Sequence, residues 1–332
     1  MSEFDYSLDP ARLSVVRDGA LVVPTAPAVF RVAGPGALDC LQGLLTGDLV
    51  KPGDDSLVYG ALLTPKGMIV VDAWVLRGQN ELLLVMPARA REAAAALLQR
   101  SLPPRLAQIT DLTDDYRALW AVGAGVYSLI LRSSLDAVPD GAGRAVRHDT
   151  LTGPLWLALA PELAPFRALA VGPAGVIDAT EAKLADSGLL PGSAEDLEAA
   201  RILSGWPALG AEIDERTLPQ EVRYDELGGV SYTKGCYTGQ ETVARVHFRG
   251  HPNRELRGLR WSEPGPLESR TILNGEREVG TVRSTLTIGD FRLGLAPIRR
   301  EVQVGDEVAA AGRPAVVTAL PFAALEPERL TS

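Results

Sequence analysis

The sequence predicts an α+β protein in two parts, a mixed α/β region over residues 1–250 and a small, barrel-like β domain over 251–332. In the first part, helical spacing of apolar residues alternates with strand-like runs. After Pro252, short alternating segments are separated by Gly, Pro and Asn, which is typical of an all-β domain. A chain of 332 residues is also too long for one hydrophobic core, so more than one domain is expected.

The first hundred residues carry clear strand and helix patterns. Residues 28–32 and 56–63 predict strands, and the apolar spacing between them predicts a helix that closes near Gly47. Residues 64–86 predict two strands joined by a turn at 77–80. An alanine-rich run of strong helix formers follows, so a helix is expected after the second strand.

The rest of the α/β region predicts strands first and helices later. Residues 110–176 alternate short apolar runs with turn residues, which indicates several strands and little long helix. Ser193, with Asp196 three residues later, is a capping signal for a helix. Another helix is expected to start at or just after Gly239.

Composition limits the function classes. Apolar residues make up 46% and charged residues 23%, which is ordinary for a soluble globular protein. The net charge of -9 argues against a chain coated with nucleic acid or bound to a membrane through a polybasic face. Only Cys40 and Cys236 are present, far apart and in no CxxC, so the chain's own thiols make neither a disulfide framework nor a four-thiolate site.

No targeting signal is visible in the sequence. The start is acidic and polar, without the basic and apolar regions of a signal peptide. The uncharged stretch 118–131 has 14 residues, too few to cross a bilayer. We therefore expect a cytoplasmic protein.

One segment stands out by its charge. From Lys234 to Arg260 there are six Lys and Arg against two acids, a local charge of +4 in a chain of -9. This contrast marks a place that can receive an anion. Cys236 lies at its start, between two glycines and two residues after Lys234.

The sequence leaves two readings of Cys236 open. It lies a few residues ahead of the predicted helix start, where unpaired N–H groups and the helix dipole favour negative charge. With Lys234 nearby, a reactive thiolate would be stabilised. Alternatively, Gly235 and Gly239 make a turn in which Cys236 fills a small buried space, as free cysteines often do.

Carboxylates cluster after the capped helix. Glu212, Asp214, Glu215 and Glu221 fall within one loop. They can read a polar ring such as the amino edge of a pterin, act as acid or base, or simply be solvated. A solvated loop is the commonest outcome for such clusters.

His247 and His251 are four residues apart and would share a helix face, as metal ligands can. No third ligand is apparent, and arginines surround them. We therefore expect no resident metal or cluster.

The string "KGCYTGQETVAR", followed by "RGHPNRELRGL", resembles the signature of the YgfZ proteins, the folate-binding relatives of glycine-cleavage T-protein (GcvT) that assist iron–sulfur cluster assembly or repair. "RILSGWPALGAEIDERTLPQE" and the N-terminal strings "VAGPGALDCLQGLLTGDL" and "ALLTPKGMIVVDAWVLR" are also similar to segments of that superfamily. The resemblance covers nearly the whole chain, and its most specific element is K-G-C-x-x-G-Q-E at 234–241.

The chain departs from the T-protein pattern at one position that matters. Aminomethyltransferases resemble one another in a string like "VVNAxNxxKD", whose aspartate is credited with catalysis. The corresponding stretch, 83–95, reads "LLVMPARAREAAA" and has neither aspartate nor asparagine. The resemblance therefore implies a YgfZ-type protein without aminomethyltransferase activity, and whether it turns over any substrate stays open.

The resemblance implies a ring of three subdomains around a central channel: two interleaved α/β subdomains in 1–250, with the cysteine motif at 234–241, and the β-barrel in 251–332. Tetrahydrofolate, or a folate derivative, is expected in the channel. Cys236 is expected as a thiolate with Lys234 as its electrostatic partner, and Gly235 and Gly239 should allow close backbone approach. The residues expected around the folate are Glu212, Asp214, Tyr237, Gln240, Glu241, Arg245, Arg249 and Arg254.

Three functions follow as alternatives. The first is a folate-dependent accessory factor for iron–sulfur clusters, and thereby for cluster enzymes such as those that modify tRNA, with transient iron–sulfur client or carrier proteins as partners and no membrane or direct nucleic-acid ligand. The second is a folate-dependent one-carbon transferase of T-protein type. The third is a non-catalytic binding module, for example on a tRNA-modifying complex, supported only by the basic arc from Arg245 to Arg260, and retention of RNA that falls steeply with salt would favour it.

Overall fold

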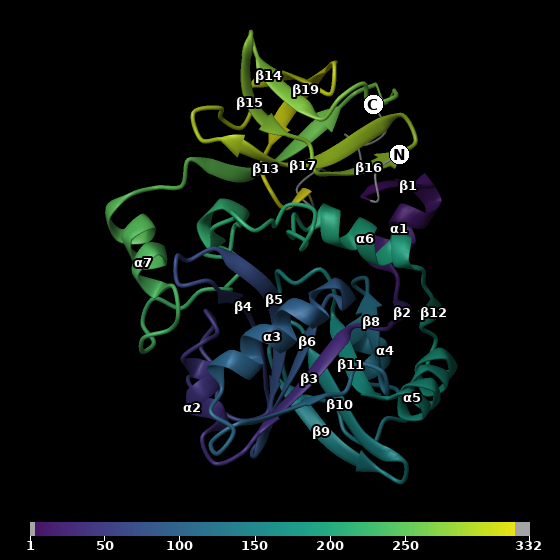
Figure 1. Ribbon diagram of the computed structural model, residues 1–332. Helices are drawn as coiled ribbons and strands as arrows, with labels where there is room; N and C mark the ends of the chain where they lie inside the picture. Colours follow the sequence, from purple (N-terminus) through teal and green to yellow (C-terminus); the bar gives the residue numbers. More distant parts are fainter. Residues whose placement is uncertain (1–3, 264, 323–332) are drawn as a thin grey trace.

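The computed structural model describes residues 4–263 and 265–322 and contains three β-sheets. Figure 1 shows the C-terminal sheet at the top of the molecule and the two α/β sheets below it, with helix α6 (Ala194–Leu203) between them. Each sheet has its own buried apolar cluster, and a further cluster fills the space where the three meet.

The five-stranded sheet has the order β4-β5-β6-β3-β7 with antiparallel neighbours. Its strands are β3 (Ala28–Ala33), β4 (Ser56–Leu63), β5 (Ile69–Arg77), β6 (Glu81–Met86) and β7 (Gln108–Asp111). The helical segments beside it are α2 (Ala37–Gln42), η1 (Ala88–Ala90) and α3 (Arg91–Ser101). The strands predicted over 28–32 and 56–63, and the pair within 64–86, are confirmed.

The helix predicted to close near Gly47 is shorter than expected. Helix α2 ends at Gln42, and the N–H of Gly43 bonds to Asp39 O. The chain then runs along β4, because Leu45 bridges to Leu62 and the Thr46 N–H bonds to Ala61 O. The apolar residues after Gln42 therefore pack in an extended segment beside β4 and not in a helix.

The six-stranded sheet has the order β12-β2-β8-β11-β10-β9. Its strands are β2 (Leu21–Thr25), β8 (Tyr116–Val122), β9 (Ala145–Thr150), β10 (Gly153–Leu159), β11 (Ala168–Pro173) and β12 (Leu190–Pro191), and its helices are α4 (Val126–Ile130) and α5 (Ala174–Asp186). The strands predicted over 110–176 are confirmed. Helix α5 was not predicted, because its N-cap is Pro173 and no side chain caps it.

Six strands of the C-terminal sheet close into a barrel, in the order β17-β13-β19-β18-β14-β15, with β15 pairing back to β17. They are β13 (Arg254–Trp261), β14 (Thr271–Asn274), β15 (Arg277–Thr281), β17 (Phe291–Arg299), β18 (Glu307–Ala310) and β19 (Arg313–Thr318). The predicted C-terminal barrel is confirmed.

Two more strands extend the barrel sheet: β16 (Ser284–Ile288) pairs with β17, and β1 (Asp5–Leu8) pairs with β16 in parallel. The N-terminal strand thus belongs to the sheet of the C-terminal region, fixed by a 2.8 Å hydrogen bond from Thr285 Oγ1 to Asp5 Oδ1. The predicted domain boundary at residue 250 does not account for this pairing of the N-terminal strand with the barrel sheet, and the boundary stays a prediction.

The remaining segments connect the sheets. They are α1 (Pro10–Asp18), α6, η2 (Pro219–Val222) and α7 (Gln240–Arg249). The capping signal is confirmed, because the Ser193 side chain accepts from the Asp196 N–H and the Asp196 side chain accepts from the Ser193 N–H. Helix α7 starts directly after Gly239, as predicted. In the described part of the chain, every helix is too short or too polar to cross a membrane.

Candidate functional site

A cavity of about 380 Å³ lies where the two α/β sheets meet helix α6. Its walls include Asp72 and Trp74 from β5, Trp120 from β8, Phe166, Arg201 from α6, and Trp206. The volume falls in the range of small-molecule sites, and the lining is mostly apolar and aromatic, as is usual for such sites. We refer to it as the aromatic cavity.

Asp72 is the buried acid of this cavity. Its side chain is carried by strand β5, which is otherwise apolar from Ile69 to Leu76, and the residue is only 7% exposed. The Tyr59 hydroxyl donates to Asp72 Oδ2 at 2.9 Å and lies 2.9 Å from the Tyr224 hydroxyl. Asp72 Oδ1 has no hydrogen-bond partner among the described residues. A buried acceptor without a partner is costly, so this oxygen is suited to accept a donor from a ligand.

Burial sets the protonation of this group. It raises the pKa of Asp72 to about 6, against the opposing hydrogen bond from Tyr59. Burial, together with the nearby Asp72 carboxyl, raises the pKa of Tyr59 well above its ordinary value. Tyr59 therefore stays a hydroxyl donor, and near neutral pH the Asp72 carboxyl can be present in either form.

Aromatic rings form the walls beside Asp72. The Trp74 and Trp206 rings are stacked, with centroids 5.4 Å apart and planes at 19°, and Phe166 meets Trp74 edge-on at 4.9 Å. Tyr59 packs against both tryptophans at 4.9 and 4.6 Å. Parallel indole faces next to a carboxyl group favour a flat heteroaromatic ligand that carries N–H donors.

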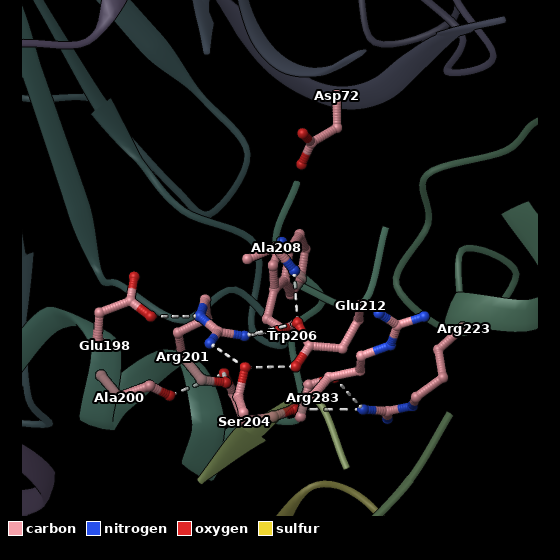
Figure 2. A network of polar contacts seen from close by, with 12 residues as sticks. Asp72, Glu198, Ala200, Arg201, Ser204, Trp206, Ala208, Glu212, Arg223 and Arg283 are labelled. Atoms are coloured by element: carbon pink, nitrogen blue, oxygen red, sulfur yellow. Dashed lines mark hydrogen bonds and ion pairs between the residues drawn. The ribbon is translucent and has the colours of Figure 1, made fainter. Parts of the chain in front are cut away.

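A buried ion-pair network closes the cavity toward the barrel. Figure 2 shows the Arg201 guanidinium between Glu198 and Glu212. Arg201 Nε donates to Glu198 at 2.8 Å, and Nη1 lies 3.2 Å from Glu212 Oε2. Nη2 donates to Ser284 Oγ of the barrel sheet at 2.9 Å. Arg201 thus joins α6 to the barrel while it lines the cavity.

The predicted folate carboxylates lie outside the aromatic cavity. Glu212 is 2% exposed, and both of its oxygens are engaged, Oε1 by Ser284 and Oε2 by Arg201 and the Ala208 N–H. Asp214 accepts from Thr217 Oγ1 at 3.0 Å and pairs with Arg283 at 3.3 Å. Both line a second cavity of about 330 Å³ together with Glu221 and Arg254. Within the described residues, the two cavities share no lining residue.

Cys236 lies on the surface. Its side chain is exposed, so the alternative of a small residue filling a buried space is wrong. The helix that follows it begins at Gln240 with Gly239 as N-cap. We refer to residues 232–239 as the cysteine loop.

Lys234 holds the cysteine loop onto the end of α2. Its Nζ donates to three carbonyl oxygens, those of Gln42 and Leu45 at 2.7 Å and that of Gly47 at 2.8 Å. An ammonium has three N–H donors, so none is left for the Cys236 sulfur. Burial lowers the pKa of Lys234 to about 8, and Asp48 opposes this shift. The geometry favours a structural tether over the direct partner of a thiolate.

The two glycines of the motif differ. Gly239 has φ +82°, and a Cβ there would lie 2.6 Å from Thr64 O, so the cysteine loop packs directly against the turn at Thr64. A Cβ on Gly235 would meet nothing within 4 Å. The close backbone approach expected at both positions is therefore found at Gly239 alone.

The other predicted folate residues surround the cysteine loop and α7. Tyr237 is buried, with Lys234 Nζ 5.2 Å from its ring centroid, and its hydroxyl has no partner among the residues described. Gln240 is half-buried at the start of α7, and Glu241 is exposed. Arg245 and Arg249 on α7 and Arg254 at the start of β13 are also exposed. None of these six lines the aromatic cavity.

The sequence reading missed the residues that build the aromatic cavity, chiefly Asp72, Trp74 and Trp206. A signal for Asp72 was available in the sequence. The acid lies within the apolar run 69–76, and burying a carboxyl group costs free energy unless it has a partner. Trp206 follows the capped helix without any motif. In the described part of the chain, no three His, Cys, Asp or Glu side chains gather as a metal site would need.

Residues 15–135 match the model of the GCVT N-terminal domain. A protein named tRNA-modifying protein YgfZ from Enterobacter sp. (strain 638) is 27% identical over 286 residues, 85% of each chain. One of the same name from Escherichia coli O157:H7 is 28% identical over 268 residues, 79% of this chain and 80% of that protein. The glycine cleavage system aminomethyltransferase T from Bartonella henselae superposes with a TM-score of 0.78 at 18% identity, over 94% of this chain and 89% of that one. The expected GcvT-like fold is confirmed.

Proposed function

Since this chain is a YgfZ-type protein with the GcvT-like fold, we propose that it binds tetrahydrofolate in the aromatic cavity and serves as an accessory protein in iron–sulfur cluster assembly or repair. Cluster-dependent enzymes, including those that modify tRNA, would depend on it. The name of the similar proteins, tRNA-modifying protein YgfZ, supports the last point.

The observation that carries the folate proposal is the free oxygen of Asp72 beside stacked indole rings. A reduced pterin presents an amino group and a ring N–H on one edge, and a carboxylate accepts such a pair of donors well. The Trp74–Trp206 pair, which is already stacked on itself, would offer an outer indole face on which the ring stacks. Arg89, which also lines the cavity, would offer charge to the glutamate end of the folate. When bound, tetrahydrofolate would supply nitrogen atoms that carry one-carbon units.

Cys236 is proposed as the group that meets the iron–sulfur partner. Its thiol is exposed on a loop that Lys234 and Gly239 fix to the body of the protein. One exposed thiol cannot hold a cluster alone, so any cluster contact would be shared with a client or carrier protein. This arrangement suits a transient bridging ligand.

The folate proposal is tested by thermal unfolding with added tetrahydrofolate. A ligand that binds only the folded state raises Tm, and at a hundred times Kd it adds about 2.7 kcal/mol. A rise in Tm is expected, and no shift at saturating concentration would contradict binding. The thiol proposal is tested in a strain that lacks the protein: Cys236→Ala should fail to restore the activity of a cluster enzyme, and full restoration would remove the role.

A transferase of T-protein type remains the second candidate, because Asp72 places a carboxyl group in the aromatic cavity. Residues 86–89 of the stretch that replaces the T-protein string also line the cavity, and none of them carries a carboxylate. Incubation with an aminomethyl donor and tetrahydrofolate decides the question. We expect no methylenetetrahydrofolate, and its formation would establish the transferase.

A further inference from the structure

Helix α7 lies at the edge of the molecule with little to cover it. Figure 1 shows it on the outer side, joined to the barrel by an extended segment. Of its ten residues only Val243 is buried. Isolated helices of this length are marginal in water, so an uncovered α7 suggests that a partner contacts it. We define the α7 surface as Tyr232, Arg245, His247, Phe248, Arg249 and Arg254.

Three rings on this surface form a fixed cluster. The Tyr232 and His247 rings are stacked at 3.7 Å with planes at 17°, and Phe248 meets both edge-on. Asp225 holds the two stacked rings, because it accepts from the Tyr232 hydroxyl and its Oδ2 lies 3.2 Å from His247 Nδ1. Phe248 itself is 66% exposed. A large ring that is exposed yet supported from one side is prepared to stack with another ring.

The α7 surface carries three exposed arginines, and one exposed acid, Glu241, lies on α7 four residues before Arg245. Arg245, Arg249 and Arg254 are exposed and make no ion pair within the described residues. Three further acids are engaged: Glu226 pairs with Arg223, Glu255 pairs with Arg257, and Asp225 pairs with His247 within the ring cluster. Arg254 also lines the second cavity, beside Asp214 and Glu221. The surface therefore keeps local positive charge on a chain of net charge -9.

We propose that the α7 surface binds a single-stranded segment of RNA, with bases stacked on Phe248 and phosphates paired with Arg245, Arg249 and Arg254. Exposed aromatic rings interleaved with arginines are the combination that single-stranded nucleic acids need, since every base has a face and every nucleotide a charge. The negative charge elsewhere on the chain limits the contact to a short segment. This inference names a partner for the proposed role in tRNA modification and rests on it, and it replaces the expectation of no direct nucleic-acid ligand.

The test is fluorescence anisotropy of the full chain with a labelled oligouridine of about 12 nucleotides and with an unmodified tRNA transcript. Phe248→Ala should weaken binding roughly 5- to 100-fold through the lost stacking. Arg245→Gln and Arg249→Gln should each lower the slope of log affinity against log salt by about 1. Tyr127→Ala and Arg105→Gln, at an exposed ring and an exposed arginine elsewhere, are the matched controls and should change nothing.

Two results would overturn the proposal. The first is that neither RNA binds at low salt. If the Phe248→Ala protein also fails to support cluster enzymes in the strain that lacks the protein, the surface docks an acidic protein instead of RNA. The second is equal binding by Phe248→Ala and Tyr127→Ala. Tetrahydrofolate affinity of the same variants separates this proposal from the function on which it rests, because Phe248 lies outside the aromatic cavity.

Discussion

The aromatic cavity and the cysteine loop are built in opposite ways. The cavity collects single residues from several elements, and its acid is buried with one oxygen free. The cysteine loop is one continuous string, and its thiol is exposed. In the loop, the Lys234 ammonium donates its hydrogen bonds to backbone carbonyls. A ligand can thus be held by residues that form no motif, while a motif can serve mainly to hold a loop in place.

The largest effect on stability is expected in the network around Arg201, because this residue both lines the cavity and joins α6 to the barrel. Arg201→Met leaves Glu212 buried without its cation, so the free energy of unfolding should fall by about 3–5 kcal/mol in urea titration. Adding Glu212→Gln should restore part of the loss, since the uncompensated charge is removed. A loss below about 1 kcal/mol would mean that the pair does not stabilise the joint.

Asp72 gives the cavity a pH dependence on the acidic side of neutral, whereas the shifted group of the loop, Lys234, has a pKa of about 8. The pKa is about 6 in the folded protein against an ordinary 3.8, so between these values the native state binds more protons than the unfolded state. Stability from this group is therefore lost as pH rises through about 6, by up to roughly 3 kcal/mol. Asp72→Asn should remove the loss.

The measurement is Tm from about pH 4 to about pH 7 for both proteins. The difference in Tm, Asp72→Asn minus wild type, should grow as pH rises from 3.8 to about 6 and then level off. Asp149→Asn, at an exposed carboxylate, is the control and should follow the wild type. A difference that stays constant with pH would show that burial does not set the pKa of Asp72.

The two glycines of the cysteine loop offer a matched pair of variants. Gly239→Ala puts a Cβ against Thr64 O at φ +82° and should cost about 1–3 kcal/mol. Gly235→Ala enters open space and should change the free energy of unfolding by less than about 0.5 kcal/mol. Equal losses in urea titration would mean that the loop does not pack on the turn at Thr64.

The smallest expected effect is at the thiol itself. Cys236→Ser changes an exposed side chain, so stability should stay within about 0.5 kcal/mol of wild type. Cys40→Ser, half-buried against the core of the five-stranded sheet, is the control and should lose more. A larger loss for Cys236→Ser would give the thiol a structural role and weaken its proposed function.

The sequence predicted the strands, the capped helix and the terminal barrel because each depends on local pattern. Ser193 and Asp196 satisfy one another within a single turn, and β4 is mostly apolar and is buried from end to end. The exchange of β1 into the barrel sheet could not be foreseen, because pairing of Asp5 with Thr285 joins distant segments. The same limit hid Trp74 stacking on Trp206. The sequence motif pointed to Cys236 and Lys234. Only the structure shows that the Lys234 ammonium donates to backbone carbonyls.

The most direct test of the account compares tetrahydrofolate affinity in Asp72→Asn and Cys236→Ser by calorimetric titration. If the ligand lies in the aromatic cavity, Asp72→Asn should weaken binding roughly 10- to 100-fold, since it removes a charged acceptor. Cys236→Ser should bind as the wild type does, because the exposed thiol lies outside that cavity. Unchanged binding by Asp72→Asn together with a loss in Cys236→Ser would contradict the separation of the two regions.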